Sequence, residues 1–362
     1  MIEKKKILFI AEMLAGRGGM ENVTRQVTLQ LNADPEYSAG LFLLDSDCEF
    51  SASSWREGIV WGQSKRITRN PKITRLMHAA MLALFIAKHK PDHVIAMNTI
   101  PCLIARRAIT LSRVKTVLST WMHLPPNGRY RPRYLMRADH HFAISRDIAN
   151  QLVALGAAPE SIDVVFNPVR KVATVIKRPE SLKMLYLGRI HFTGQKNLKD
   201  LLDAASKLTT TWSLDILGDG EDYARCLAYA DSLGIAQHIT WHGWQDNSWD
   251  YIEKNIKEVT CLVLTSSMEG LPLVLLEAIA RGIYCVSSDC VSGPSDIIKD
   301  GINGQLYETY NVDELVSILD APDFCKTLPD QEIVKDSIHD FYEDAYMTNF
   351  KNILQQRKQG TL

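Results

Sequence analysis

Cys261-Leu-Val-Leu264-Thr-Ser-Ser-Met-Glu269-Gly-Leu-Pro272-Leu-Val-Leu-Leu-Glu277 is the stretch that decides the fold. An apolar run typical of a buried strand leads into a loop, and a helical pattern follows from Pro272, whose fixed φ suits a helix start. In open parallel α/β sheets, ligands bind outside the carboxyl ends of the strands. Glu269 and Glu277 can therefore face one crevice and accept hydrogen bonds from a polyol or a ribose. A surface glutamate followed by a helix-face glutamate is the alternative interpretation.

Length and composition indicate a soluble globular protein with two domains. A chain of 362 residues exceeds one ordinary hydrophobic core, and 46% apolar with 23% charged residues is a globular composition. Residues 1–166 carry 22 Lys and Arg against 14 Asp and Glu, whereas residues 167–362 carry 19 against 28. The basic half suits an anionic acceptor or an anionic membrane surface, and a basic face without a partner is the alternative.

The cysteines and the apolar runs indicate a reducing compartment and at most peripheral membrane contact. Seven cysteines without a C-x-x-C pair are typical of a reducing compartment. The longest apolar stretch, 79–87, is far shorter than the roughly 20 residues that span a bilayer. The run at 7–11 is too short for a signal peptide and predicts a first strand.

Strand-like runs alternate with helical patterns, which predicts two Rossmann-like domains with parallel sheets. The domains are expected at 1–167 and 168–333, and a final helix at about 334–358 can pack back on the first. A linker is expected at 171–181, after Asn167-Pro168. The predicted strands are 7–11, 39–44, 93–97, 114–121 and 140–144, then 184–187, 213–217, 238–241, 261–264 and 283–287. Helical spacing is clearest at 20–31, 73–89 and 333–353.

Glycine-containing loops follow several predicted strands. Gly16-Arg17-Gly18-Gly19 precedes a helix, so its amides can approach an anionic or sugar ligand, although the third glycine of a dinucleotide fingerprint is missing. Gly188-Arg189 with Lys196 can place two cations beside a departing diphosphate. The alternative for the first motif is a flexible turn without a ligand. The alternative for the second is a pair of solvated loop cations.

Two further loops and one histidine complete the candidate site. Leu217-Gly218-Asp-Gly220 and His242-Gly-Trp244 each let a planar ring approach the backbone, and Trp244 can form a wall for a base. His123 follows a predicted strand of the first domain, where it can contact a sugar hydroxyl or help to move a proton. A tryptophan at the edge of the core is the alternative for Trp244.

Clusters of charged residues suggest more than one possible binding partner and one possible metal site. Basic residues gather at 65–75 and 129–137, which suits phosphates of a lipid-linked glycan or an anionic leaflet. No recognisable nucleic-acid-binding module accompanies them, so nucleic acid is not expected. Asp45-Ser-Asp47 is similar to the D-x-D of metal-dependent sugar transferases, but an acidic surface loop explains it equally well, and no metal is expected.

Together these motifs resemble the retaining family 4 glycosyltransferases of the GT-B fold, in which two Rossmann-like domains face each other across a cleft. The resemblance covers nearly the whole chain. Further words that carry it are Phe166-Asn-Pro-Val169, Trp121-x-His123, Leu264-Thr-Ser-Ser267 and, most specifically, Asp289-Cys-Val-Ser-Gly-Pro-Ser-Asp296.

The resemblance implies metal-independent transfer of a hexose, galactose from UDP-galactose, to a glucose of the lipopolysaccharide outer core in α-1,6 linkage. It implies that the first domain binds the acceptor and the second the nucleotide sugar, on the cytoplasmic face of the inner membrane. By position, Arg189 and Lys196 would hold the diphosphate and Glu277 the ribose. Further implied contacts are Gly18, Gly19, Leu217, Gly218, Trp244 and Glu269, with the amides of Gly270 and Leu271, while His123 would contact the donor sugar.

Two departures from the family pattern leave alternatives open. Val274 stands where family members carry threonine, so only its backbone can contribute, and the stretch 46–68 differs from relatives in a loop region expected to choose the acceptor. Retention in this family is described as front-face attack, so no enzyme nucleophile is assigned. A UDP-sugar epimerase, a transferase with another UDP-hexose or glycan acceptor, and a non-catalytic glycan-binding protein are the alternatives.

Overall fold

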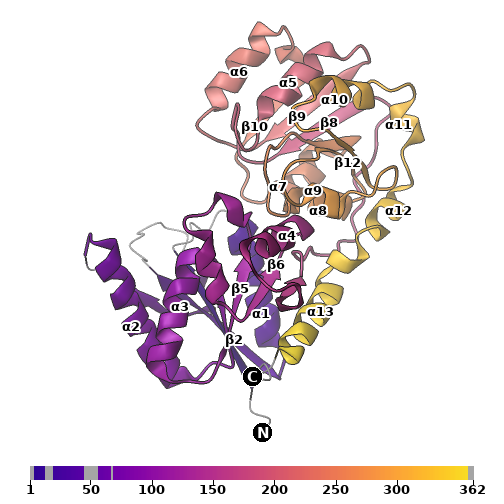
Figure 1. Cartoon of the computed structure of the whole chain (residues 1–362). Coiled ribbons are helices and arrows are strands. Elements are labelled where there is room, and N and C mark those ends of the chain that lie inside the picture. Colours follow the sequence, from indigo (N-terminus) through magenta and orange to yellow (C-terminus); the bar gives the residue numbers. More distant parts are fainter. Residues whose placement is uncertain (1–3, 13–18, 45–55, 67, 358–362) are drawn as a thin grey trace. The chain divides into compact units, whose positions relative to one another are not determined.

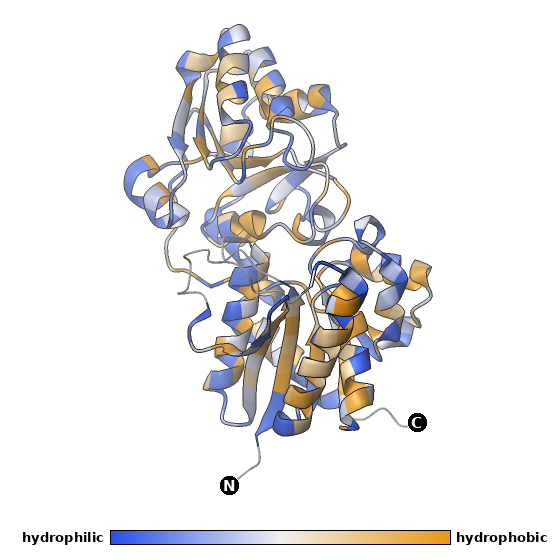
Figure 2. Cartoon of the chain, turned by 90° about the vertical axis from the view of Figure 1, so that its left-hand side faces the viewer, coloured by the Kyte–Doolittle hydropathy of each residue, from blue (hydrophilic) through white to orange (hydrophobic). Residues whose placement is uncertain are grey.

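The chain forms two compact units, residues 1–168 with 346–362 and residues 169–345. The computed structural model describes residues 4–12, 19–44, 56–66 and 68–357. Each unit contains one parallel sheet and its crossover helices (Figure 1). Hydrophobic residues follow the strands, and hydrophilic residues lie mostly on loops and outer helix turns (Figure 2).

The first unit is built on a seven-stranded parallel sheet in the order β3-β2-β1-β4-β5-β6-β7. Its strands are β1 (Lys5–Glu12), β2 (Tyr37–Leu44), β3 (Val60–Ser64), β4 (His93–Ala96), β5 (Val117–Met122), β6 (His140–Ala143) and β7 (Ile162–Val164). Its helices are α1 (Gly19–Ala33), α2 (Pro71–His89), α3 (Thr99–Ser112) and α4 (Arg146–Leu155), joined by most of α13 (Glu343–Gln356). Because all neighbouring strands are parallel, their carboxyl ends share one edge of the sheet.

The second unit repeats this design with a six-stranded parallel sheet in the order β10-β9-β8-β11-β12-β13. Its strands are β8 (Leu182–Leu187), β9 (Trp212–Leu217), β10 (Ile239–Gly243), β11 (Cys261–Leu264), β12 (Tyr284–Ser288) and β13 (Gly304–Tyr307). Its helices are α5 (Leu198–Lys207), α6 (Tyr223–Ser232), α7 (Ser248–Tyr251), α8 (Leu273–Ile279), α9 (Pro294–Ile297), α10 (Val312–Leu319), α11 (Phe324–Thr327) and α12 (Gln331–Asp336). The two parallel sheets confirm the predicted Rossmann-like architecture.

All ten predicted strands are present, and the three strands that were not predicted lie at sheet edges. β3 and β7 are the outermost strands of the first sheet, and β13 is an outermost strand of the second. An edge strand has one neighbour and is short, so it lacks the continuous apolar run that marks a buried parallel strand. Helices α3 and α4 were also missed, although Asn98 and Ser145 cap their N-termini.

The C-terminal segment differs from the single helix expected from the pattern at 333–353. Helix α12 ends at Asp336, and α13 begins only at Glu343. Between them Tyr342 is extended and pairs with Val169, whose amide donates to Phe341 O and whose carbonyl accepts from Glu343 N. This pairing interrupts the helix, because a residue in the extended conformation cannot continue it.

Aromatic side chains attach α13 to the first unit. The ring of Phe350 is fully buried, with centroids 5.7 Å from Trp121 and 5.4 Å from Phe142. Lys351 pairs with Asp34 at 2.8 Å, and Arg357 pairs with Asp163 at 3.0 Å. Within the described residues, no helix is both long enough and apolar enough to span a bilayer.

Replacing Phe350 by alanine is expected to destabilise the first unit by about 3–5 kcal/mol, because it leaves a cavity among buried aromatic rings. Lys351→Ala is the control on the same helix, and it should cost less than about 1 kcal/mol because its ion pair is partly exposed. Urea unfolding followed by tryptophan fluorescence measures both. Equal losses in the two variants would contradict the docking of α13 through its aromatic side chains.

Candidate active site

Three glycine loops lie side by side at the carboxyl edge of the second sheet. Gly188, Gly218 and Gly243 follow or end the neighbouring strands β8, β9 and β10. The amide of Gly188 donates to Leu217 O at 3.0 Å, and the amide of Gly218 donates to Gly243 O at 2.9 Å. The structure thus brings three of the predicted motifs into one continuous backbone surface.

Gly218 permits this close approach. Its φ is +145°, and a Cβ atom there would lie 1.8 Å from Gly188 O. No other residue fits without moving the neighbouring backbone, so glycine is required for the close approach of these two loops. Trp244 follows this surface with 53% of its area exposed, and its indole N–H donates to Asp246 at 3.0 Å. Leu217 is fully buried, and its carbonyl oxygen accepts the hydrogen bond from Gly188.

Lys196 and Glu269 form an ion pair in this unit. The ammonium Nζ lies 2.7 Å from Glu269 Oε1, with the two side chains only 18% and 9% exposed. Hydrogen bonds hold the loop of Lys196 against the segment after β11: Thr265 Oγ1 donates to Lys196 O, and Ser267 N donates to Gln195 O. The predicted cation and the predicted carboxylate therefore meet in a largely desolvated place, where charge is felt strongly.

The turn that carries Glu269 is held from its other side by the loop before α9. Glu269 N donates to Val291 O at 3.0 Å, and Ser292 Oγ donates to Gly270 O at 2.9 Å. Gly293, at φ +99°, lies so close that a Cβ there would be 2.8 Å from Gly270 O and from Leu271 Cα. The sequence motif at 289–296 thus has a structural role, because its contacts fix the backbone conformation of residues 269–271.

Glu277 lies on α8, and a tryptophan orients its carboxylate. The indole N–H of Trp249 on α7 donates to Glu277 Oε2 at 2.8 Å, and the Arg281 guanidinium lies 4.4 Å from that ring's centroid. Arg281 is itself paired with Glu253 at 2.8 Å. Burial raises the pKa of the Glu277 carboxyl, while the Trp249 hydrogen bond and the charge of Arg281 lower it. Folded-state stability from this group is therefore lost as the pH rises through its raised pKa.

The remaining predicted residues of the second unit are also located. Arg189 is exposed directly after β8, and its carbonyl accepts from Tyr186 Oη at 2.8 Å. Val274 is half-buried in the first turn of α8, which Pro272 precedes as N-cap residue. Sequence reasoning missed Trp249 and Arg281. Arg281 follows Glu277 by four residues and donates to its carbonyl oxygen at 3.1 Å, so its helical spacing could have found it. Trp249 stands in no such pattern, and only the packing of α7 against α8 connects it with Glu277.

In the first unit, His123 lies just beyond β5 and is only 7% exposed. Burial lowers its pKa to about 3, so its imidazole is neutral near pH 7. The ring packs against Trp121 with centroids 4.5 Å apart, and Nε2 has no hydrogen-bond partner among the described residues. A neutral imidazole with an uncommitted nitrogen can exchange a hydrogen bond with a hydroxyl group.

Some predicted residues lie outside the described ranges. Gly18 and Asp45-Ser-Asp47 belong to them, while Gly19 is the first residue of α1. Among the residues that the structure describes, no group of three or more His, Cys, Asp or Glu side chains is arranged to hold a metal ion.

Comparison with known proteins gives two family models that follow each other along the chain and near full-length relatives. Residues 17–171 match the family model Glycosyltransferase Family 4, and residues 172–321 match Glycosyl transferases group 1. The chain is 36% identical to the lipopolysaccharide 1,6-galactosyltransferase of Salmonella typhimurium strain LT2, over 98% of this chain and 99% of that protein. It is also 36% identical to the protein of the same name from Escherichia coli K12, over 96% and 98%.

Solved structures agree with these sequence matches. The apo form of the lipopolysaccharide outer core galactosyltransferase WaaB matches with a TM-score of 0.92 at 36% identity, over 97% of this chain and 99% of that chain. Anabaena Alr3699/HepE in complex with UDP matches with a TM-score of 0.78 at 16% identity, over 97% and 100%. The second match is evidence for a common fold.

Replacing Trp249 by phenylalanine is expected to raise the pKa of Glu277 further, because it removes the hydrogen bond that favours the carboxylate. A pH titration of the Glu277 side-chain carbon by ¹³C NMR measures the change. Trp244→Phe is the matched control. The indole N–H of Trp244 donates to Asp246, so the pKa of Glu277 should not change in this variant. A pKa that is unchanged or lowered in Trp249→Phe would refute the assigned role of the indole.

Proposed function

This chain belongs to the family 4 glycosyltransferases of the GT-B fold, and we propose that it transfers galactose from UDP-galactose to a glucose of the lipopolysaccharide outer core in α-1,6 linkage. The observation that carries the proposal is 36% identity over nearly the full length to lipopolysaccharide 1,6-galactosyltransferases. The buried Lys196–Glu269 pair supplies the matching chemistry. The protein is a UDP-sugar-dependent hexosyltransferase that retains the anomeric configuration.

Fixed positive charge assists the departure of UDP. When the bond between the hexose C1 and the phosphate oxygen breaks, negative charge develops on that oxygen. The Lys196 ammonium, held in a largely buried position, stabilises this charge more in the transition state than in the ground state. Arg189, exposed after β8, is the second cation for the diphosphate.

Retention follows from attack on the face that UDP leaves. The acceptor hydroxyl oxygen bonds to C1 on that face, and its proton passes to the departing phosphate oxygen. Glu269 is not assigned as a nucleophile. It balances the charge of Lys196 and accepts hydrogen bonds from hexose hydroxyls, with the amides of Gly270 and Leu271 beside it. Val274 contributes only backbone atoms.

The nucleoside end of the donor is held by the glycine surface and by Glu277. The ribose hydroxyls donate to the Glu277 carboxylate, whose Oε2 is oriented by Trp249. Uracil lies on the backbone at Leu217 and Gly218, with Trp244 as a wall. The family resemblance further proposes Gly18 and Gly19 as donor contacts and neutral His123 as a hydrogen-bond partner of a hexose hydroxyl.

Galactose transfer to a truncated lipopolysaccharide core, followed with radiolabelled UDP-galactose, is expected to persist in EDTA because Lys196 and Arg189 replace a metal at the diphosphate. Activity abolished by EDTA and restored by Mg²⁺ or Mn²⁺ would contradict this and point to Asp45-Ser-Asp47. Conversion of the UDP-sugar without an acceptor would instead indicate an epimerase.

Lys196→Ala is expected to lower kcat about 10²–10³-fold, as for loss of one group that stabilises transition-state charge. Lys207→Ala removes an exposed ammonium paired with Asp313 and should leave the rate unchanged. Removing one partner of a buried pair can also destabilise the fold. Lys196→Met combined with Glu269→Gln avoids a lone buried charge, so this variant should fold without transferring. Wild-type rates in it would contradict the mechanism.

We further propose that the enzyme works on the cytoplasmic face of the inner membrane and contacts the anionic surface through α2. This helix exposes the apolar side chains of Ile73, Leu76, Met81 and Leu84, the last with 74% of its area exposed. These positions share one helical face. Basic residues flank it at both ends, namely Arg69, Lys72, Lys88 and Lys90. An apolar stripe between cations complements an anionic bilayer surface.

Leu76→Glu combined with Leu84→Glu should abolish co-sedimentation with vesicles containing anionic phosphatidylglycerol, because two carboxylates would enter the bilayer interface. Val153→Glu on α4 is the control, since Val153 is an exposed apolar residue away from α2. Hydrolysis of UDP-galactose in solution should be the same in all variants. Undiminished sedimentation of the double variant would exclude α2 as the membrane contact.

A further inference from the structure

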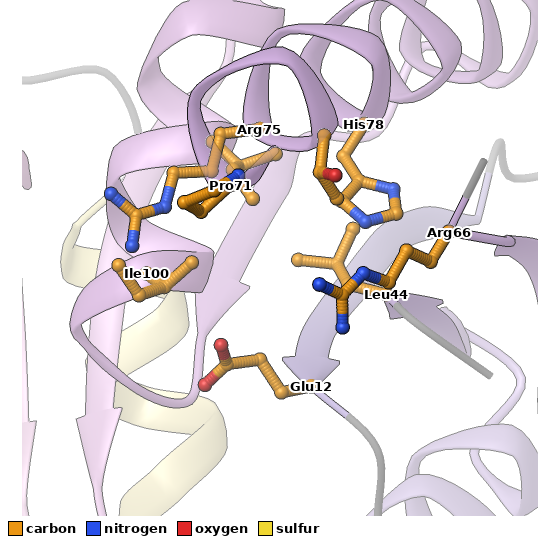
Figure 3. A pocket seen from close by; sticks show the side chains of 9 residues that line it. Glu12, Leu44, Arg66, Pro71, Arg75, His78 and Ile100 are labelled. Carbon is orange, nitrogen blue, oxygen red and sulfur yellow. The ribbon is translucent and has the colours of Figure 1, made fainter. Parts of the chain in front are cut away.

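A small pocket in the first unit is not used by the donor contacts proposed above. It has a volume of about 150 Å³ and lies where β1 and β2 end and α2 and α3 begin. Nine residues line it, and Figure 3 labels seven of them: Glu12, Leu44, Arg66, Pro71, Arg75, His78 and Ile100. It therefore lies at the carboxyl edge of the first sheet, where parallel α/β folds bind their ligands.

Two guanidinium groups give the pocket its positive side. Arg66 donates from Nε to Thr68 O at 3.1 Å and from Nη2 to Arg69 O at 3.3 Å, which orients its fork. Arg75 lies on the second turn of α2, with its guanidinium 5.3 Å from the centroid of Tyr130. Among the described residues, neither arginine forms an ion pair with a carboxylate. Both charges are thus available to an external anion.

The fold adds to this positive side. Helices α2 and α3 both direct their N-terminal turns toward the pocket, through Pro71 and Ile100. The partial positive charge of a helix N-terminus favours an anion, and arginine forks match the geometry of a phosphate group. These two features act together with a defined cavity, so the site does not rest on the helix ends alone.

Glu12 places a negatively charged carboxylate on the side of the pocket opposite the two arginines. Its carboxylate lies below the two arginines in Figure 3, and its Oε2 accepts a hydrogen bond from Asn98 Nδ2 at 3.5 Å. A carboxylate at this position repels a second anion but accepts hydrogen bonds from sugar hydroxyls. The pocket is therefore suited to one residue that carries both a phosphate and hydroxyl groups.

We propose that this pocket binds a phosphate-bearing sugar of the acceptor glycan, with Arg66 and Arg75 on the phosphate and Glu12 on a ring hydroxyl. The inference rests on the proposed function in taking a glycan as the acceptor. It goes further in assigning a subsite that recognises a charged group away from the hydroxyl that is galactosylated. Such remote contacts position the acceptor and can choose between glycans of similar shape.

The test compares one truncated lipopolysaccharide core before and after removal of its phosphates. In Arg66→Gln and Arg75→Gln, the acceptor KM is expected to rise roughly tenfold for each arginine with the phosphorylated core, as for loss of a charge-assisted hydrogen bond. The KM for UDP-galactose should stay the same. With the dephosphorylated core, variants and wild type should have equal KM values.

Controls separate recognition of phosphate from other effects. Arg113→Gln removes an exposed cation just before β5, at the opposite edge of the same sheet, and should change nothing. Arg75→Lys keeps the charge but loses the fork, so its KM should be intermediate. Equal changes with both cores, or none with either, would overturn the proposal.

A binding measurement distinguishes this proposal from the proposed function. Isothermal titration of the phosphorylated core into the wild type and into Arg66→Gln with Arg75→Gln requires no transfer. Binding that is lost only in the double variant supports the pocket, even if no galactose is transferred and the proposed function fails. Binding that is equal in both proteins overturns it, even if transfer is observed.

Discussion

The ion pair between Lys196 and Glu269 is the interaction around which the candidate site of the second unit is arranged. Each partner is almost covered by protein, and neither charge would be tolerated there alone. The surrounding hydrogen bonds are consistent with this demand: Thr265 and Ser267 hold the lysine loop, while Val291 and Ser292 hold the glutamate turn. The outcome is a cation whose position is set before any substrate binds.

The second unit also holds a row of glycines and an oriented carboxylate in fixed positions. The glycine row after β8, β9 and β10 provides a surface made of main-chain atoms, which side-chain motion cannot disturb. Glu277 provides an oriented acceptor because Trp249 occupies one of its oxygens. The three glycine loops lie at the carboxyl edge of one sheet, which is the place where parallel α/β folds bind their ligands.

The candidate binding residues of the two units differ in charge. The first unit has a neutral histidine and two arginines without a carboxylate partner among the described residues, whereas the second has the ion pair of Lys196 and Glu269. Burial keeps the His123 imidazole uncharged near pH 7, so it can exchange a hydrogen bond with a hydroxyl group without adding charge to this unit. Arg66 and Arg75 stay accessible at their own pocket. Two units with the same architecture have thus acquired different electrostatic roles, because function resides in the side chains at the sheet edge and not in the fold.

The sequence by itself determined the two parallel sheets, ten of their strands and the loops that carry Arg189, Lys196 and Glu269, because buried strands and the loops after them leave local patterns. It could not reveal the edge strands β3, β7 and β13, whose patterns are short and mixed. Nor could it show that Trp249 orients Glu277 from 28 residues away, or that Arg66 and Arg75 line one pocket. These features arise from packing between distant segments, and only the tertiary structure decides which side chains then share one low-dielectric place.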